Sequence, residues 1–109
     1  MESLSLNGFI GTEQYHNVMG SNITDGVAYI MEHGYSWFVN DAIIISKMKI
    51  KQEDFIVVDL KVNEDNTAEV IYSDGNKNEL YKQKYNYTDA EQNIKLYFTN
   101  NVLMLPTEY

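Results

Sequence analysis

The chain has 109 residues, 44% of them hydrophobic and 13% aromatic, which predicts a single domain over residues 1–109 with one core of ordinary size. Sixteen acidic residues face eight lysines and no arginine, and the net charge of −8 argues against nucleic acid or an anionic membrane as a direct partner. The lack of cysteine excludes disulfides and thiol catalysis, and together with the lack of a signal-peptide pattern it predicts a protein of the bacterial cytoplasm.

The first 24 residues give only weak structural signals. Residues 1–10 alternate weakly between apolar and polar side chains, which favours a short edge strand or an ordered arm. Thr12 is a residue type that caps helices, so residues 11–16 are predicted to form a helical turn, and residues 20–22 have the composition of a loop.

A first clear helix is predicted to begin after Thr24, whose hydroxyl can accept a hydrogen bond from a free N–H group of the first turn. Val27, Ile30 and Met31 recur at the spacing that places side chains on one helix face. Gly34 suits the left-handed position just past a helix C-terminus, so this helix is predicted to end there.

Residues 35–48 form the longest apolar run and hold the only tryptophan, Trp37. Drawn as a helix capped by Ser36, the run leaves only a narrow polar stripe at Asn40 and Lys47. A helix with so little polar surface is expected to be fully buried, and it is shorter than the roughly 20 residues that span a bilayer. We therefore predict that it is the core helix on which a sheet packs.

Short strands separated by turn residues follow this helix. In the first of them, over residues 54–62, alternate side chains are apolar and predict one buried face. Asp74-Gly75 and Asn100-Asn101 are strong hairpin signals. The predicted fold class is α+β, with two consecutive helices, one of them fully buried, packed on one face of an antiparallel meander of about five strands. The strands are expected at residues 54–62, 67–73, 79–87, 93–99 and 102–105.

Asp41 is the one carboxylate that the helical projection places within the apolar face of residues 35–48. A buried carboxyl group with a raised pKa is a candidate general acid. We favour a structural interpretation, in which the indole N–H of Trp37 or a tyrosine hydroxyl from the sheet satisfies it. His16 and His33 lack the spacing of a zinc site, so neither a metal nor another cofactor is predicted.

Residues 74–79 place oxygen-bearing side chains at alternate positions, as a calcium-binding loop does. The pattern fails because Glu79 stands where such a loop needs glycine, and the bidentate glutamate at its last position is missing. A hairpin turn is therefore the favoured interpretation of this segment.

Tyr81, Tyr85 and Tyr87 are expected on one face of one strand, where tyrosines serve either a protein interface or a core. Because Lys82 and Lys84 occupy the other face, we favour the core.

Acidic residues concentrate in turns that a meander would place at the same end of the sheet. Glu64 and Asp65 lie in the first turn, and Asp89 and Glu91 lie in the third. We call these four residues the acidic end and predict that they bind a basic protein surface; the alternative is that they only keep the protein soluble. The full set of candidate partner-binding residues is Glu64, Asp65, Asp89, Glu91, Asp74, Glu79, Tyr81, Tyr85 and Tyr97.

Eight segments of the chain resemble, in order, a family of small uncharacterised proteins encoded by phages and conjugative elements, mostly of Bacteroidetes. The segments are LNGFIGTEQY, ITDGVAYI, YSWFVNDAI, VNEDNTAEV, SDGN, NYTD, IKLYFTNNVLMLP and the terminal EY. What the resemblance implies is a mobile-element context, in which short acidic proteins often bind and disable a host defence system, as anti-CRISPR proteins do. It carries over no catalytic or binding residue, since that family has no assigned activity.

We therefore expect a small acidic protein that binds and inhibits a host defence nuclease, such as a CRISPR nuclease, by occupying a basic surface that handles nucleic acid. The alternative is a non-enzymatic accessory or structural protein of a phage or conjugative element that acts as a homodimer. It would pair through an exposed edge strand or through a patch of Phe55, Val57, Ile71 and Tyr97 on the outer sheet face. An enzyme is not expected, because no nucleophile, base and orienting group are recognisable together.

Overall fold

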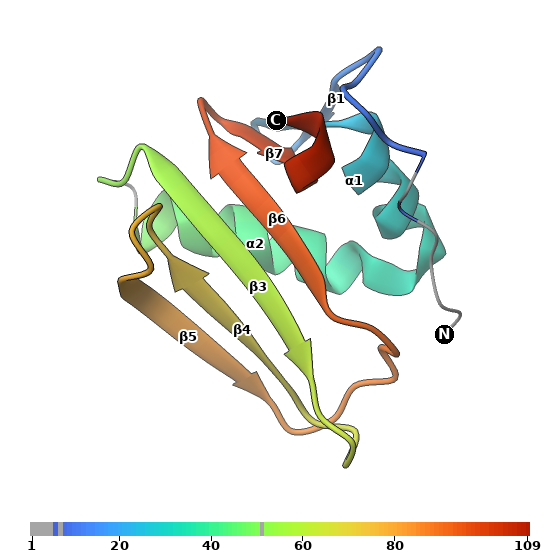
Figure 1. Cartoon of the computed structure of the whole chain (residues 1–109), viewed down its shortest axis with the longest axis vertical. Helices are drawn as coiled ribbons and strands as arrows, with labels where there is room; N and C mark the ends of the chain where they lie inside the picture. The colour runs from blue at the N-terminus through green and yellow to red at the C-terminus, as the bar shows by residue number, and fades with distance from the viewer. Residues whose placement is uncertain (1–5, 7, 51) are drawn as a thin grey trace.

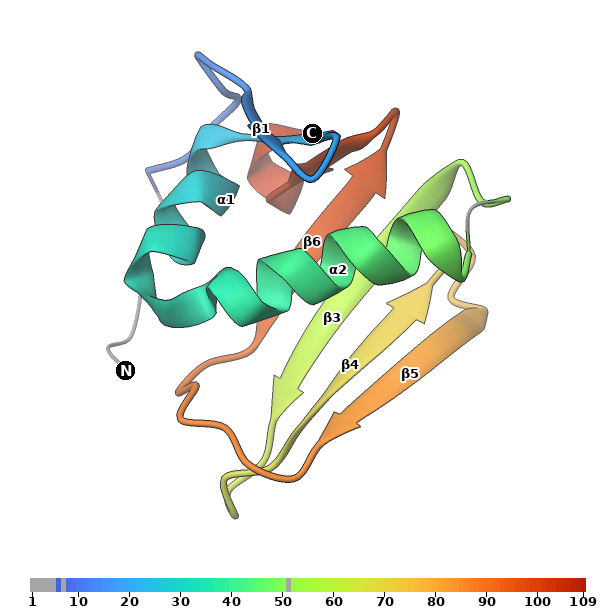
Figure 2. The same ribbon diagram turned by 180° about the vertical axis from the view of Figure 1, so that it is seen from behind.

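The computed structural model describes residues 6, 8–50 and 52–109, which form one sheet with a helical layer on one of its faces (Figure 1; Figure 2). The strands lie in the order β1-β2-β7-β6-β3-β4-β5, and all neighbours are antiparallel except β2 and β7, which are parallel. This is a mixed α+β fold, as the sequence predicted at the level of fold class. The strand bounds are β1 His16–Val18, β2 Ser21–Ile23, β3 Phe55–Val62, β4 Ala68–Ser73, β5 Glu79–Tyr85, β6 Ile94–Thr99 and β7 Val102–Met104.

The predicted meander of five strands is wrong in its number of strands. The helical turn predicted over residues 11–16 is absent, since residues 11–15 are irregular and His16 begins β1. A hairpin of β1 and β2 replaces the loop predicted at residues 20–22, and its turn lies at Met19 and Gly20, which have φ values of 50° and 83°. Each of these strands has three residues, of which two are polar, so the alternation that identifies a longer strand never develops. The edge strand or arm predicted over residues 1–10 falls largely outside the described residues, and the described positions among them form no strand.

The lateral order of the predicted meander is also wrong. β6 pairs with β3 and not with β5, so residues 86–93 cross the end of the sheet to reach it (Figure 1). The hairpin between β6 and β7 is confirmed, because Asn100 and Asn101 have φ values of 52° and 62°, which suit a type I′ turn.

One helical run of 24 residues replaces the two separate helices. It consists of α1 (Asp25–Ile30), a π-helical turn η1 (Met31–Tyr35) and α2 (Ser36–Met48). Gly34 adopts the left-handed backbone expected of it, with φ of 98°. His33 and Gly34 both have non-helical backbone angles, so the helical run is kinked at this point.

α2 is not fully buried, contrary to the prediction. Its inner residues Phe38, Val39 and Ile43 are at most 1% exposed, whereas Ile44 and Met48 are 40% and 71% exposed. The helical layer is the outermost layer on its side of the sheet, so the far side of α2 faces solvent (Figure 2). An apolar helix projection identifies residues that tolerate burial, but the neighbouring elements decide which of them are covered.

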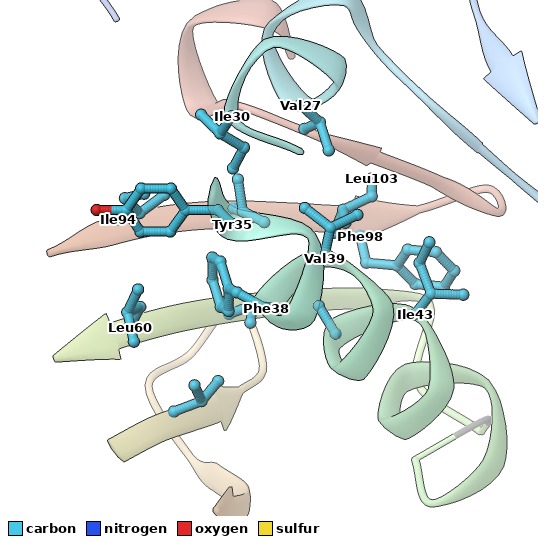
Figure 3. Packing of buried hydrophobic residues seen from close by; sticks show 14 of the residues in the cluster. Val27, Ile30, Tyr35, Phe38, Val39, Ile43, Leu60, Ile94, Phe98 and Leu103 are labelled. Atoms are coloured by element: carbon cyan, nitrogen blue, oxygen red, sulfur yellow. The ribbon is translucent and has the colours of Figure 1, made fainter. Parts of the chain in front are cut away.

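The core lies between this helical run and the inner face of the sheet (Figure 3). The predicted inward side chains of β3, which are Ile56, Val58 and Leu60, are confirmed at no more than 1% exposure. Together these contacts fix α2 across β6, β3 and β4. Figure 3 shows Val27, Ile30, Tyr35, Phe38, Val39 and Ile43 of the helical run meeting Leu60, Ile94, Phe98 and Leu103 of the sheet.

The C-terminal turn η2 (Pro106–Glu108) holds the start of the helical run. Oε1 of Glu108 accepts hydrogen bonds from the Thr24 hydroxyl at 2.6 Å and from the Leu105 N–H at 3.0 Å, and Oε2 accepts one from the Gly26 N–H at 2.9 Å. Thr24 occupies the predicted N-cap position, but its hydroxyl donates and does not cap. A carboxylate from the other end of the chain therefore satisfies the helix start, where a negative charge is also favoured by the helix dipole.

Gly26→Ala is expected to destabilise the protein by about 2 kcal/mol, as overpacking of a core does, although the same change in an exposed helix usually stabilises. A Cβ at this position would meet the Leu105 side chain and would lie 2.6 Å from Oε1 of Glu108, whose three hydrogen bonds oppose movement. Urea denaturation measures the loss. Gly75→Ala is the matched control, because its Cβ would find only Phe55 Cδ1 at 3.9 Å. A Gly26→Ala variant as stable as the unmodified protein would show that the Glu108 contact is not tight.

Candidate functional site

Two loops meet at one end of the sheet (Figure 1). One is the turn between β3 and β4 at residues 63–67, and the other is the crossing segment at residues 86–93. The Thr88 N–H donates to the Asn66 carbonyl at 2.7 Å, and the Val62 N–H donates to Oδ1 of Asn93 at 2.8 Å. The acidic end thus belongs to two loops that are hydrogen-bonded to each other.

The four carboxylates of the acidic end are exposed but differ in their bonding. Oδ1 of Asp65 accepts hydrogen bonds from the Thr67 hydroxyl at 2.5 Å and from the Thr67 N–H at 3.2 Å, and these bonds hold the pKa of Asp65 below its ordinary value. The side chains of Glu64, Asp89 and Glu91 make no hydrogen bond or ion pair with the part of the chain that the structure describes. Three carboxylates of the acidic end are therefore available to another molecule.

A cleft of about 350 Å³ opens between α2 and the segment that leaves β5. Trp37 and Asp41 lie one turn apart on α2, and the rings of Trp37 and Tyr85 meet edge to face with centroids 5.1 Å apart. Asp89 lies in the wall, so the cleft and the acidic end are continuous. The residues that line the cleft are Trp37, Asp41, Tyr85, Tyr87, Thr88 and Asp89.

Asp41 is held by a tyrosine hydroxyl from the sheet, which confirms one of the two partners predicted for it. The Tyr85 hydroxyl donates to Oδ2 of Asp41 at 2.6 Å and lies 3.2 Å from Oε1 of Gln83, which also accepts from the Tyr72 hydroxyl at 3.0 Å. Burial first, and then the hydrogen bond to Asp41, raise the pKa of Tyr85 well above its ordinary value. This arrangement joins α2 to the edge strand β5.

Asp74 and Glu79 lie at the opposite end of the sheet from the acidic end. Oδ1 of Asp74 accepts from the Asn76 N–H at 2.8 Å and the Asn78 N–H at 3.0 Å, and Oδ2 accepts from the Asn78 side chain at 3.0 Å. These bonds close the β4–β5 hairpin, which confirms the hairpin interpretation of this segment. Glu79 lies 3.7 Å from Lys82, so both acidic side chains already have partners.

The three predicted partner-binding tyrosines fall in different environments. Tyr81 packs on Tyr72 with ring centroids 6.0 Å apart and, like Tyr85, contacts the core, which confirms the core interpretation for these two residues. Tyr97 lies on the reverse sheet face, with its ring 5.0 Å from that of Phe55. The core interpretation is wrong for Tyr87, which lies beyond the end of β5 and is 74% exposed at the cleft.

Both histidines have local partners. The Nε2–H of His16 donates to Asp25 at 3.0 Å, and the Nδ1–H of His33 donates to the Tyr29 carbonyl at 2.7 Å. Within the described residues, no three His, Cys, Asp or Glu side chains lie together as a metal site would require. Nor do these residues contain a helix with the length and apolar character needed to cross a bilayer.

Sequence reasoning identified Trp37, Asp41 and the tyrosines singly but missed the cleft that joins them. The only local signal was the four-residue spacing of Trp37 and Asp41, which puts both on one side of a helix. That Tyr85 and Asp89 lie opposite depends on how α2 crosses the sheet, which the sequence pattern does not specify.

Tyr85→Phe is expected to lower the free energy of unfolding by about 1 kcal/mol at neutral pH, because it removes a hydrogen bond to a carboxylate. The pKa of Tyr85 is higher in the folded than in the unfolded chain, so its contribution is present below about pH 10 and is lost as the pH rises further. Urea denaturation of both proteins from neutral pH upward should therefore show the difference between them shrinking above about pH 10. A difference that stays constant over this range would contradict the raised pKa of Tyr85, and equal stability of the two proteins at neutral pH would contradict the bond to Asp41.

Comparison with curated proteins and with solved structures gives no match. A protein family does match, over residues 2–109, and its description assigns no activity. The prediction of an uncharacterised family is confirmed at that level. The chain belongs to the family of unknown function DUF6876.

Proposed function

We propose that the protein is a non-catalytic inhibitor whose acidic end binds a basic, nucleic-acid-handling surface of a host defence protein such as a CRISPR nuclease. The observation that carries the proposal is the set of three carboxylates, Glu64, Asp89 and Glu91, that have no partner among the described residues and lie on two hydrogen-bonded loops. Such a surface complements a groove that normally holds a phosphate backbone.

The loop geometry favours binding because the two loops that carry the carboxylates are already held together. The Thr88–Asn66 and Val62–Asn93 hydrogen bonds tie the loops to each other and to β3, so less conformational freedom is lost on association. A net charge of −8 would also attract a basic partner over distance, and this attraction weakens as salt is added. The expected signature is therefore affinity that falls with ionic strength.

The mobile-element context of the proposal rests on the sequence resemblance alone. The family description is silent on it, and a fold does not specify an activity. The choice of a defence protein as partner follows from that context, whereas the choice of a basic surface follows from the carboxylates. These two parts can fail separately.

A matched pair of triple variants tests the acidic end. One variant combines Glu64→Gln, Asp89→Asn and Glu91→Gln. It should bind a defence effector that the unmodified protein retains in a pull-down roughly 30-fold or more weakly, which corresponds to about 2 kcal/mol for charge pairs lost at an interface. Glu13→Gln, Glu53→Gln and Asp54→Asn remove the same charges away from the acidic end and should leave affinity nearly unchanged. Pull-down with candidate effectors at low and high salt, followed by calorimetry, measures both.

Three outcomes of this experiment contradict the proposal. Binding that resists salt removes the electrostatic mechanism. If both triple variants lower the affinity for the effector equally, binding depends on the net charge of the protein and not on the acidic end. If the pull-down at low salt retains no basic effector that handles nucleic acid, the protein is not an inhibitor of the proposed kind.

A second candidate function is a homodimeric accessory protein, and it is favoured by the reverse sheet face. The rings of Phe55, Tyr97 and Tyr109 pack together there with centroids 5.0 to 5.8 Å apart, beside a groove of about 440 Å³ that includes Val57 and Ile71. No helix covers β3, β4 or β5 on this face (Figure 1) in the part of the chain that the structure describes. Aromatic side chains on an open sheet face are typical of an interface.

Sedimentation equilibrium at micromolar concentration tests the second candidate. A dimer through this face should become a monomer in Ile71→Lys, because the new charge would be buried between the two copies. Ile44→Lys is the control, since Ile44 is 40% exposed on the opposite, helical side and should leave the dimer intact. An unmodified protein that is strictly monomeric would exclude this candidate.

A further inference from the structure

The cleft beside the acidic end combines aromatic walls with two carboxylates. The rings of Trp37 and Tyr85 contact each other in its lining, Tyr87 is 74% exposed there, and Asp41 and Asp89 also line it. Its volume of about 350 Å³ is near the small end of the range for ligand sites, which suits one side chain and not a large cofactor.

The chemistry of the cleft is complementary to a cation. Aromatic faces attract positive charge, Trp most strongly, and a carboxylate beside them adds a direct ionic partner. Among the described residues, no lysine lines the cleft and none forms an ion pair with Asp41 or Asp89. Both carboxylates therefore lack a positive partner from the described chain.

The hydrogen bonding of Asp41 favours a guanidinium over an ammonium group. Tyr85 uses Oδ2 of Asp41, which leaves Oδ1 and the carboxylate of Asp89 as separate acceptors on the walls. A planar guanidinium carries five donors in a fixed fork and also stacks on aromatic rings, so it matches both kinds of group that line the cleft. An ammonium is a compact point charge that is more strongly hydrated and cannot stack.

We propose that this cleft binds an arginine side chain from the basic surface of the protein partner. The inference rests on the proposed function, and it adds the one residue type on which docking is centred. The acidic end would attract the basic surface, and the cleft would receive a single arginine next to it.

Intrinsic fluorescence tests the cleft directly, because Trp37 is the only tryptophan. An acetylated and amidated Gly-Arg-Gly peptide should change the Trp37 emission and saturate in the millimolar range. The citrulline analogue, which is neutral and of the same shape, should produce no saturable change. Gly-Lys-Gly should bind at least fivefold more weakly than the arginine peptide.

Two variants assign the signal to the cleft. Tyr87→Ala and Asp41→Asn should each lower the affinity for the arginine peptide about tenfold. Glu64→Gln should leave this affinity unchanged, because Glu64 lies outside the cleft lining. Tyr87 is 74% exposed, so its removal leaves the core intact and the test does not depend on whether Asp41→Asn disturbs the bond to Tyr85.

Several results would overturn the inference. Equal responses to the arginine and citrulline peptides, or no saturable response, exclude a cation site. Equal binding of lysine, or tighter binding of tetramethylammonium than of arginine, excludes a guanidinium site. An arginine peptide whose affinity is unchanged in Tyr87→Ala binds elsewhere.

The failures of this inference and of the proposed function are distinguishable. The inference is wrong and the proposed function stands if the arginine peptide fails to bind and partner affinity falls in the acidic-end triple variant but not in Tyr87→Ala. If the arginine peptide binds as expected but no basic partner is retained, the proposed function is wrong and the cleft stands as a guanidinium site.

Discussion

The carboxylate of Glu108 joins the end of the chain to the start of its helical run, and the placement of the helical layer depends on this contact. It satisfies the Gly26 N–H and the Thr24 hydroxyl, which are 82 and 84 residues away in the sequence. The Thr24 N–H in turn donates to the Leu103 carbonyl of β7 at 3.2 Å. The helix start is thereby fixed on the parallel pair of β2 and β7, and only a residue without a Cβ fits at Gly26.

From that fixed start, the bend at Gly34 directs α2 across the sheet, and further polar contacts hold its course. Lys47 donates to the Met19 carbonyl at 2.9 Å near one end, and Asp41 accepts from Tyr85 at 2.6 Å nearer the other. The second bond reaches the edge strand β5, so the cleft has one wall from each layer. A site built between two elements in this way is defined by their packing and not by a local motif, so a motif search of the sequence does not find it.

The bounds and faces of β3 to β7 were largely predictable, because alternation at a period of two is a local property of residues such as Ile56, Val58 and Leu60. The Asn100-Asn101 turn was also predictable from a local property, because asparagine tolerates the positive φ that this turn needs. Lateral strand order was not, since pairing of β6 with β3 instead of β5 depends on contacts distant in sequence. The role of Glu108 was equally hidden, because a lone acidic residue near the end of a chain carries no sequence signal for capping a distant helix.

The meeting of the acidic loops was predicted from a wrong strand order, and strand direction explains why the placement still held. β4 is antiparallel to β3 and to β5, so β3 and β5 both finish at the end of the sheet where β6 begins, whatever their lateral order. Direction alone puts the two loops at one end. Their contact needs more: because β6 pairs with β3, the crossing segment passes the β3–β4 turn, where Thr88 bonds to Asn66. In a meander the same segment would have stayed beside β5, so the strand order that the sequence could not give is what brings the two loops into hydrogen-bonding contact.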